Sequence, residues 1–384
     1  MSPRLYIDVH VIQTVPPANL NRDDQGNPKE AVYGGVRRSR VSSQAWKRAT
    51  RLHFDAQIAE PDRATRSKRL TGGLADRITH ASGLDKESAV RIASALLGQL
   101  GLSQGKKDGD TAYLLFYGNA QLDNVAALVT DRADELTALD DKDLTEAVKD
   151  LPVADCFKTG HPVGVALFGR MVADIPALNV DAAVQVAHAL STHETELEFD
   201  YFTAVDDKNE KDETGAGMIG TIGFNSATLY RYATVGLEQL TDNLGGDTDA
   251  TLDALGHFID GFVRSAPTGY QNSFAHRTRP GLVAVVVRAD QPVNLVSAFE
   301  DPIQHEAGIQ AASARRLAEE YLTATKMWGD TPLHTAVSHT FGTGDPRTKD
   351  TAEALSQAFG NPVGFPELLA GLRARIASLT EKTA

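Results

Sequence analysis

The N-terminal segment constrains the fold most, because its side chains alternate between apolar and polar. Four apolar residues occupy every second position on one face: Leu5, Ile7, Val9 and Val11. Tyr6, Asp8 and His10 fall on the opposite face. A period of two predicts a half-buried β-strand. His10 is therefore expected on the surface of a sheet and not in a catalytic site.

Residues 22–51, which follow this strand, are strongly basic. They contain eight cationic residues: Arg22, Lys29, Arg37, Arg38, Arg40, Lys47, Arg48 and Arg51. Three acids, Asp23, Asp24 and Glu30, leave a local charge of +5. The whole chain has 38 Lys/Arg and 51 Asp/Glu, and hence a net charge of −13. A positive segment in an acidic chain indicates an anionic partner, and phosphate is the first candidate.

The basic segment begins as a loop. Gly26 and Pro28 interrupt residues 21–29, which are polar and are predicted to form turns. Gly34 and Gly35 follow, and two glycines would let a ligand approach the backbone closely.

The segment ends as a helix. Ser42 or Ser43 is a suitable N-cap for a helix over residues 44–53. Its polar and cationic side chains share one face: Gln44, Lys47, Arg48 and Arg51. A capped helix start beside a row of cations would suit a phosphodiester chain. The pattern alone is equally compatible with a solvated basic surface.

Length and composition indicate a soluble globular protein of more than one lobe. The chain has 384 residues, 42% of them hydrophobic and 23% charged. Its single cysteine, Cys156, excludes an internal disulfide and a zinc site made of cysteines. No signal-peptide core or membrane-spanning apolar run is present, so a cytoplasmic location is expected.

Residues 55–175 have the character of a helical insertion. Residues 86–97, 119–138 and 144–151 show helical apolar spacing, and Gly/Lys/Asp loops separate them. Lys106 and Lys107 lie in one of these loops, where they would either contact nucleic acid or simply face solvent.

Residues 179–190 are predicted to return to the first domain as an amphipathic helix. His188 and His193 are five residues apart, whereas a helical pair of metal ligands would be four apart. We therefore interpret both histidines as structural.

An acidic two-stranded arm is predicted next. Residues 194–201 alternate strictly, and a polar tip over residues 206–217 precedes a second strand. Nine acids and two lysines lie between Glu194 and Glu213, so the arm cannot hold phosphates by charge. Phe202 and Met218 would instead act on bases as apolar wedges. Alternatively, the arm packs only on a neighbouring subunit.

The remaining segments complete a sheet with helices around it. Residues 224–235 are predicted to be the return strand, and Thr248 to be the N-cap of a helix that ends near Arg264. Residues 265–278 form a Pro/Gly loop that carries amides and hydroxyls. The continuous apolar run 282–288 suits the middle of a sheet. Residues 301–384 are expected to be peripheral helices.

The sequence contains few of the short motifs that are typical of enzymes. The chain has no Walker-type glycine–lysine motif and no HExxH. Asp23 and Asp24 are the only adjacent carboxylates in the basic segment, so a metal-dependent ribonuclease is the alternative function. Adjacent residues do not normally converge on one ion. Orientation of Arg22 or of neighbouring cations by ion pairing is the simpler role.

A family resemblance covers residues 5 to about 300. The matching blocks are LNRDD (20–24), GGVRRSRVSSQAWKR (34–48), ALFGRM (166–171), NVDAAVQVAHALSTH (179–193), DYFTAVDD (200–207), FNSATLYRYA (224–233), QNSFAHRT (271–278) and QPVNLVSAFE (291–300). In this order they resemble the backbone subunit of the type I-E CRISPR Cascade complex, the CasC family. No single block is specific, but the ordered set is.

The resemblance implies an α+β fold, with an RRM-like or ferredoxin-like palm, an inserted helical fingers lobe and a protruding β-hairpin thumb. The corresponding boundaries are 1–54 (first part of the palm), 55–178 (fingers), 179–195 (palm helix), 196–222 (thumb) and 223–384 (second part of the palm with peripheral helices). The strand, loop and helix at the N-terminus agree with such a palm, although they also open many α/β folds.

The resemblance also implies a function without catalysis, cofactor or metal. Copies of the subunit would polymerise along CRISPR guide RNA and present it for pairing with target DNA. The implied partners are the 5′-end cap, large, small and guide-processing subunits. An assembly protein that binds only other subunits remains a further alternative.

Matching positions carry over the family's RNA contacts. The expected sugar–phosphate contacts are Asn21, Arg22, Lys29, Ser42, Gln44, Lys47, Arg48, Arg51, Gln271 and Asn272. Met171, Phe202 and Met218 are expected to act on the bases.

Overall fold

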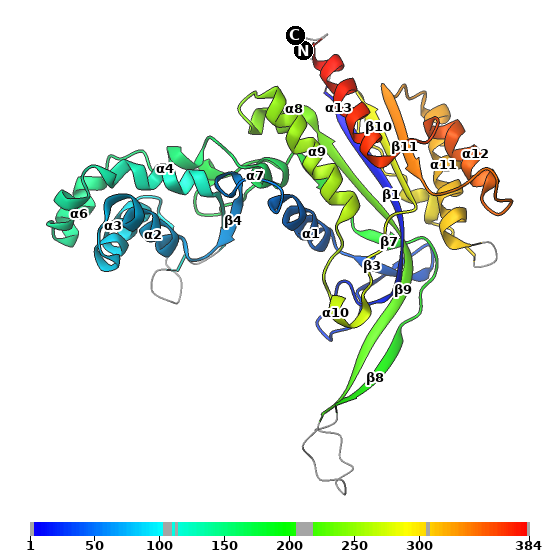
Figure 1. Ribbon diagram of the computed structural model, residues 1–384, viewed down its shortest axis with the longest axis horizontal. Coiled ribbons are helices and arrows are strands. Elements are labelled where there is room, and N and C mark those ends of the chain that lie inside the picture. The colour runs from blue at the N-terminus through cyan, green and yellow to red at the C-terminus, as the bar shows by residue number, and fades with distance from the viewer. Residues whose placement is uncertain (1–3, 103–109, 112–113, 205–217, 305–307, 382–384) are drawn as a thin grey trace, which may run out of the picture. The chain divides into compact units, whose positions relative to one another are not determined.

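The computed structural model describes residues 4–102, 110–111, 114–204, 218–304 and 308–381. The chain divides into two compact units (Figure 1). The sheet unit comprises residues 1–53, 185–235 and 256–384, and the helical unit comprises residues 54–184 and 236–255. The expected α+β fold is confirmed. None of the described helices is long and apolar enough to cross a membrane.

A nine-stranded sheet forms the centre of the sheet unit. Its described strands are β1 (Tyr6–Ala18), β2 (Glu30–Tyr33), β3 (Val36–Val41), β6 (Val184–Val186), β7 (Ala189–Ser191), β8 (Glu198–Ala204), β9 (Met218–Gly236), β10 (Leu282–Arg288) and β11 (His334–His339). The order is β11-β10-β1-β9-β7-β3-β2, and β6 and β8 also pair with β9. The apolar run 282–288 forms β10, which lies inside the sheet as expected.

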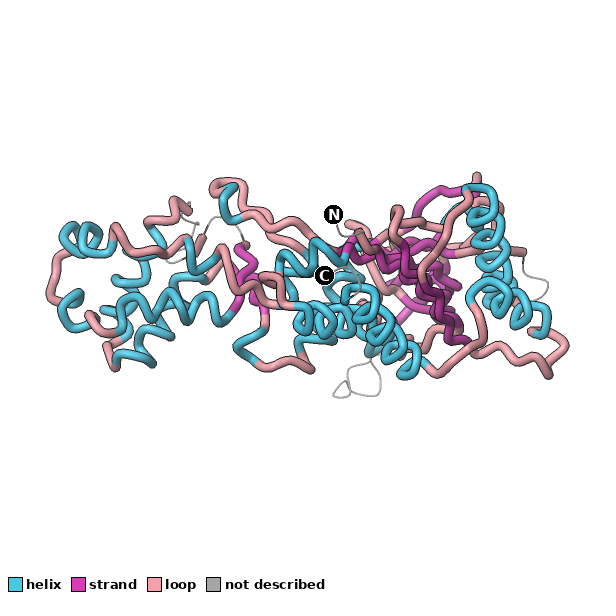
Figure 2. Tube along the Cα trace, turned by 90° about the horizontal axis from the view of Figure 1, so that it is seen from above, coloured by secondary structure: helices cyan, strands magenta, loops and turns pink. Residues whose placement is uncertain are grey.

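Helices cover both faces of this sheet (Figure 2). They are α1 (Ser43–Asp55), α9 (Thr248–Arg264), α10 (Gln271–Phe274), η4 (Val296–Phe299), α11 (Ile309–Trp328), α12 (Lys349–Phe359) and α13 (Phe365–Glu381). Along β9, Leu229 clusters with Trp46 of α1, whereas Tyr230 packs on Phe299 of η4. Because successive side chains of a strand point to opposite faces, α1 covers one face, and η4 and α11 cover the other.

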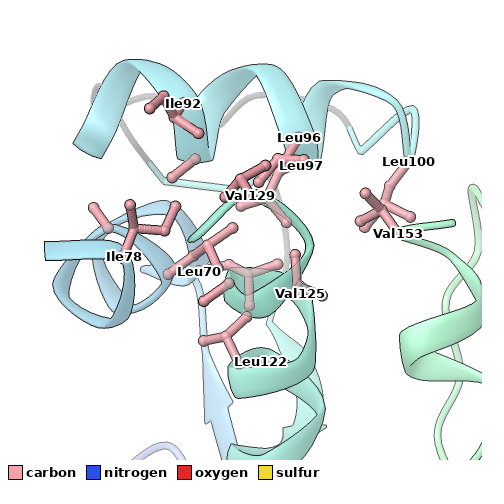
Figure 3. Packing of buried hydrophobic residues seen from close by; sticks show 14 of the residues in the cluster. Leu70, Ile78, Ile92, Leu96, Leu97, Leu100, Leu122, Val125, Val129 and Val153 are labelled. Carbon is pink, nitrogen blue, oxygen red and sulfur yellow. The ribbon is translucent and has the colours of Figure 1, made fainter. Parts of the chain in front are cut away.

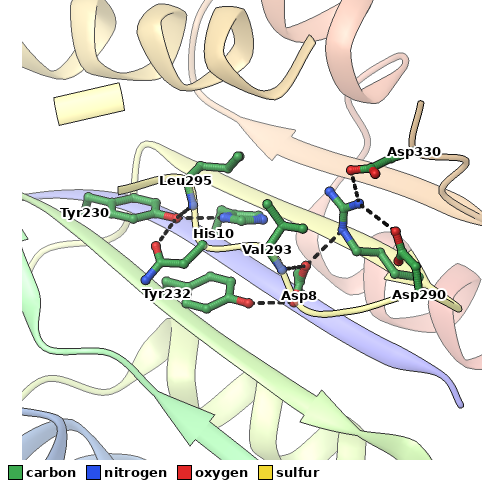
Figure 4. A network of polar contacts seen from close by, with 10 residues as sticks. Asp8, His10, Tyr230, Tyr232, Asp290, Val293, Leu295 and Asp330 are labelled. Carbon is green, nitrogen blue, oxygen red and sulfur yellow. Dashed lines mark hydrogen bonds and ion pairs between the residues drawn. The ribbon is translucent and has the colours of Figure 1, made fainter. Parts of the chain in front are cut away.

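Both faces of β1 are buried, so the expectation that His10 lies on the sheet surface is wrong. Asp8 and His10 are each 0% exposed. Nδ1 of His10 lies 2.9 Å from the Tyr230 hydroxyl. Asp8 accepts hydrogen bonds from Tyr232 at 2.8 Å and from Arg288 at 3.1 Å (Figure 4). Alternation identifies the apolar face of a strand, but it does not reveal whether helices also cover the polar face.

The helical unit contains most of the expected insertion. Its elements are η1 (Glu60–Asp62), β4 (Ala64–Ser67), α2 (Leu70–Ser82), α3 (Lys86–Gly98), β5 (Leu115–Gly118), α4 (Asn119–Thr130), α5 (Ala133–Thr137), α6 (Asp141–Val148), η2 (Asp155–Phe157), α7 (Val163–Phe168), η3 (Pro176–Leu178) and α8 (Leu237–Asn243). Ile78, Ile92 and Leu96 meet Leu122 and Val125 in a core that is separate from those of the sheet unit (Figure 3).

The helix predicted over residues 179–190 is wrong. The segment instead forms the short strands β6 and β7. The Ala187 amide donates to the Tyr232 carbonyl at 2.9 Å, and Gly236 donates to Ala183 at 2.8 Å. Pairing with the long strand β9 therefore satisfies this backbone, and tertiary context overrides an apolar pattern that local reasoning reads as helical.

The boundary between the units also differs from the expected one. Residues 236–255 belong to the helical unit, although we expected 223–384 to be one continuous part of the palm. Asn243 of α8 explains this, because its side-chain amide donates to the carbonyls of Ala166 and Asp181. Asp247 rather than Thr248 caps α9, since its carboxylate accepts from the Ala250 amide at 2.9 Å.

The expected two-stranded arm is present. β8 pairs antiparallel with the first part of β9, from Glu198↔Phe224 to Ala204↔Met218. Its tip, including the polar residues 206–217, and the loop with Lys106 and Lys107 lie outside the described residues.

Residues 301–384 are largely helical, as expected, with one exception. β11 forms there and pairs antiparallel with β10.

Candidate nucleic-acid interface

Three segments of the sheet unit meet at the end of β1, where Asn19 joins them. Asn19 is 0% exposed, and its Nδ2 donates to the carbonyls of Gly26 and Gly223, both at 2.9 Å. Gly26 belongs to the basic loop and Gly223 to the base of the β8–β9 arm. The backbone of Gly269, in the loop before α10, packs so closely on Asn19 that a Cβ would collide with the Asn19 carbonyl oxygen. Nothing in the sequence around Asn19 signals this role.

The basic loop, residues 21–29, is a tight and internally bonded turn. The Asp23 amide donates to Asn27 at 2.8 Å, and the Lys29 amide donates to Asn21 at 2.9 Å. One carboxylate oxygen of Asp23 accepts from the amides of Gln25 and Asn27, both at 2.9 Å. Asp23 therefore shapes the turn, as Asp commonly does. Within the described ranges, no group of three or more His, Cys, Asp or Glu side chains is placed to share an ion.

Asn21 and Ser42 join this loop to the start of α1. The Ser42 amide donates to Asn21 Oδ1 at 2.9 Å, and the Ser42 hydroxyl accepts from the Ala45 amide at 3.3 Å. Ser42, and not Ser43, is therefore the N-cap. The two side chains fix the helix start against the loop.

α1 presents a polar and cationic face. Trp46 and Thr50 are buried, and Gly261 of α9 packs against Thr50. Gln44 and Arg48 are exposed. Lys47 and Arg51, at helical spacing from them, are half-buried.

A buried arginine holds the apolar face of α1 on the sheet. The Arg231 guanidinium of β9 lies 3.6 Å from the centroid of the Trp46 ring and 4.6 Å from that of Phe262. It donates to Gln13 Oε1 at 2.6 Å, and burial lowers its pKa to about 9. A cation between two aromatic rings fixes the helix at a defined height above the sheet.

Arg22 reaches across to the loop that precedes α10. Its guanidinium lies 4.8 Å from the centroid of the Tyr270 ring. Tyr270 has a φ of 47°, a left-handed conformation that costs energy for a residue with a side chain. Gln271 and Asn272 follow immediately and are exposed. Asn21, Arg22, Ser42, Gln271 and Asn272 thus belong to segments that contact one another.

Not all of the cations in the segment are available to a partner. Arg38 is 0% exposed, and it donates to the carbonyls of Tyr33, Ser191 and Phe299. Burial lowers its pKa. Arg37 pairs with Glu30 at 2.8 Å. Local charge alone could not separate the buried Arg38 from exposed cations such as Arg37.

Gly34 has a structural role, whereas the ligand contact expected of Gly34 and Gly35 stays a prediction. A Cβ on Gly34 would collide with the Glu300 carbonyl oxygen, and its φ is 61°. Packing of the β2–β3 turn against Glu300 therefore requires Gly34.

The arm carries aromatic side chains at its base. The Phe202 ring is half-buried and lies over Gly220 of the paired strand. Phe199 and Tyr201 are 61% and 63% exposed, and we had not selected them. Their alternation with acids was visible in the sequence. The side chain of Met218 lies outside what the structure describes.

Met171 is displayed on a tight loop of the helical unit. Its side chain is 85% exposed. The neighbouring Arg170 is buried and donates to the carbonyls of Leu178 and Phe157, both at 2.7 Å. The Val172 amide donates to Asn179 Oδ1 at 2.6 Å. Bonds on both sides thus fix the backbone that presents Met171.

Comparison with known proteins identifies the family. A family model described as CT1975-like protein matches residues 7–360. The chain belongs to the CT1975-like family. A solved chain of a "CRISPR RNA-guided surveillance complex, pre-nicking" is similar to this family member, with 32% identity and a TM-score of 0.84, over 96% of this chain and 99% of that one. A chain of a "CRISPR RNA-guided surveillance complex" has 28% identity and a TM-score of 0.73, with the same coverage. No curated protein sequence matches.

Proposed function

We propose that this CT1975-like protein is a guide-RNA-binding backbone subunit of a type I-E Cascade complex. The observation that carries the proposal is the meeting of the basic loop, the base of the β8–β9 arm and the α10 loop around buried Asn19, with the start of α1 bonded to the basic loop through Asn21. The polar and cationic face of α1 adjoins this meeting point, in a chain of net charge −13. The similarity to chains of CRISPR RNA-guided surveillance complexes supports it.

Binding would depend on the sugar–phosphate chain. Arg22, Lys29, Gln44, Lys47, Arg48 and Arg51 would neutralise or bond to phosphates, together with Gln271 and Asn272. Such contacts carry no sequence information, so guides of any sequence would bind, and binding would weaken steeply with salt. Sequence would be read by base pairing between guide and target. Met171, Phe202 and Met218 would press on bases and divide the guide into short segments.

In this proposal the sheet unit corresponds to an RRM-like palm, the helical unit to the fingers and the β8–β9 arm to the thumb. Several copies would assemble along one guide with the 5′-end cap, large, small and guide-processing subunits, in the cytoplasm and without catalysis by this chain.

The test reverses the charge of the α1 face. A variant with Lys47→Glu, Arg48→Glu and Arg51→Glu is expected to lose guide RNA on heparin-washed affinity beads. A control variant with Lys86→Glu, Lys149→Glu and Lys158→Glu has the same net charge and should retain it. These three lysines lie in the helical unit in exposed ion pairs. Equal retention by both variants would leave a subunit-only assembly protein as the better account.

The ribonuclease alternative needs a separate assay. Labelled guide RNA incubated with the protein and Mg²⁺ is expected to stay intact, because Asp23 is committed to its own turn. Cleavage that Asp23→Asn or Asp24→Asn abolishes would establish the enzyme instead.

A further inference from the structure

A second basic surface lies in the helical unit. Residues 63–75 contain no acid and four cations: Arg63, Arg66, Lys68 and Arg69. They span β4 and the turn into α2. The side chains of Arg66, Lys68 and Arg69 are exposed.

Several other cations of this unit form ion pairs with neighbouring acids. Six such pairs are Arg77–Asp123, Lys86–Asp76, Arg91–Asp141, Arg132–Glu135, Lys149–Glu146 and Lys158–Asp155. Within the ranges that the structure describes, Lys68 and Arg69 have no acidic partner. Residues 63–75 are thus a run of cations without an intervening acid, in a chain with 51 acids and 38 cations.

The backbone beneath these side chains is fixed. Arg66 pairs with Phe116 across the β4–β5 ladder, and its guanidinium lies 4.7 Å from the centroid of the Phe116 ring. The Lys68 carbonyl accepts from the Thr111 amide at 2.8 Å. The Arg69 amide donates to the Ser67 hydroxyl at 2.9 Å. The backbone that carries the cations is therefore ordered before a partner binds.

This arrangement has an electrostatic cost. Arg69 occupies the N-cap of α2, where no side chain caps the helix and no acid lies in the first turn. The positive end of a helix dipole disfavours cations. A bound anion would relieve this repulsion.

The flanking residues favour nucleic acid over an acidic protein. Arginine and lysine side chains are the commonest contacts to the phosphates of a nucleic acid. Protein interfaces are usually anchored by aromatic side chains, and none is exposed within residues 63–75.

We propose that Arg66, Lys68 and Arg69 form a second phosphate-binding surface, which holds the backbone of a nucleic-acid strand other than the guide. The identity of this strand as one distinct from the guide rests on the proposed function, whereas the binding of phosphate by these residues does not.

The test compares two charge-matched variants of the full chain loaded with guide RNA. The patch variant carries Arg66→Glu, Lys68→Glu and Arg69→Glu, and the control is the Lys86→Glu, Lys149→Glu, Lys158→Glu variant. Two fluorescent probes are titrated from about 50 to 200 mM salt, the range over which phosphate contacts dominate. One is single-stranded DNA complementary to the guide, and the other is unrelated duplex DNA. Circular dichroism verifies that each variant is folded.

The patch variant is expected to retain guide RNA but to bind one of the probes with a shallower dependence of log K on log salt. Three lost contacts reduce the slope by about 2.7 for duplex and about 2.1 for a single strand. The affected probe identifies the kind of strand. A slope equal to that of the control would overturn the proposal and leave an acidic protein as the partner. Loss of guide RNA would also overturn it, because the patch would then belong to the guide site.

Failure of the proposed function has a different signature. If the chain retains no guide RNA at all while the patch variant still loses affinity for a DNA probe, the guide-binding role falls and the second surface stands.

Discussion

Asn19 illustrates how one buried amide can control the geometry of a candidate binding surface. Its single NH₂ group donates hydrogen bonds to two carbonyls, one in the basic loop and one in the arm. A buried donor that loses its acceptors, or a carbonyl that loses its donor, costs about 1–3 kcal/mol. The geometry therefore depends on a residue that no ligand would touch.

Asn19→Asp should lower the free energy of unfolding by about 1–3 kcal/mol, because a carboxylate would face two carbonyls without a donor. RNA affinity should fall as well, since the loop and the arm lose their common anchor. Urea unfolding and RNA binding test this. Asn243→Asp is the matched control, because Asn243 also donates to two carbonyls but lies in the helical unit. It should lose stability and keep RNA affinity; equal effects on RNA would contradict the role of Asn19.

His10 should make stability dependent on pH. Burial, together with the charge of Arg288, lowers its pKa from 6.5 to about 3. The folded state thus disfavours the protonated ring, so the stabilisation is complete above pH 6.5 and is lost as pH falls toward 3. Each pH unit in this window costs about 1.4 kcal/mol.

The measurement is the difference in unfolding free energy between the native chain and His10→Gln, from pH 7 to pH 5. That difference isolates His10 from Asp8, whose pKa burial raises and whose contribution has the opposite sign. A difference independent of pH would refute the assignment.

At the scale of elements, local patterns predicted those with a strong pattern of their own, such as a capped amphipathic helix or a continuous apolar strand. The helix over 44–53 and the strand over 282–288 formed within two residues of their expected ends. The helix over 179–190 did not form, because its backbone pairs with β9, some 45 residues away in the chain. Apolar spacing over so few residues cannot distinguish a helix from short strands whose partner is distant.

The arm also depends on a contact between residues of its two strands. The Phe202 ring occupies the space above Gly220, where any Cβ would collide with it. Gly220→Val is therefore expected to displace the ring. If the proposed function holds, guide bases are exposed to chemical probes at regular intervals, and the variant should lose this pattern with guide retention unchanged. Thr221→Val, at the exposed neighbouring position of β9, should preserve the pattern. An unaltered pattern in Gly220→Val would show that Phe202 does not act on bases.

At the scale of the whole molecule, the candidate site was predictable in its segments and not in its contacts. The local charge predicted that residues 21–51 belong to the site, and the family resemblance added residues 271 and 272. The buried role of Arg38 and the packing role of Gly34 depend on Phe299 and Glu300, more than 250 residues away. No local signal marks such partners.

The two units should respond separately to core mutations. Leu96 is 0% exposed in the core of the helical unit, and Leu96→Ala should cost about 2–5 kcal/mol. Hydrogen exchange is expected to accelerate within residues 70–157 while the strands of the sheet unit and guide retention stay unchanged. Val285→Ala in β10 provides the reciprocal case, and acceleration in both units by either variant would show that they unfold together.

β9 imposes a constraint on how chains of this kind can diverge. Its 19 residues run from the arm through the centre of the sheet, with Gly220 under Phe202, Arg231 on the α1 face and Tyr232 on the opposite face. Inserting a single residue near its start would exchange the two faces for everything downstream. Variation in length among relatives should therefore accumulate between residues 204 and 218, and β9 itself should keep its length.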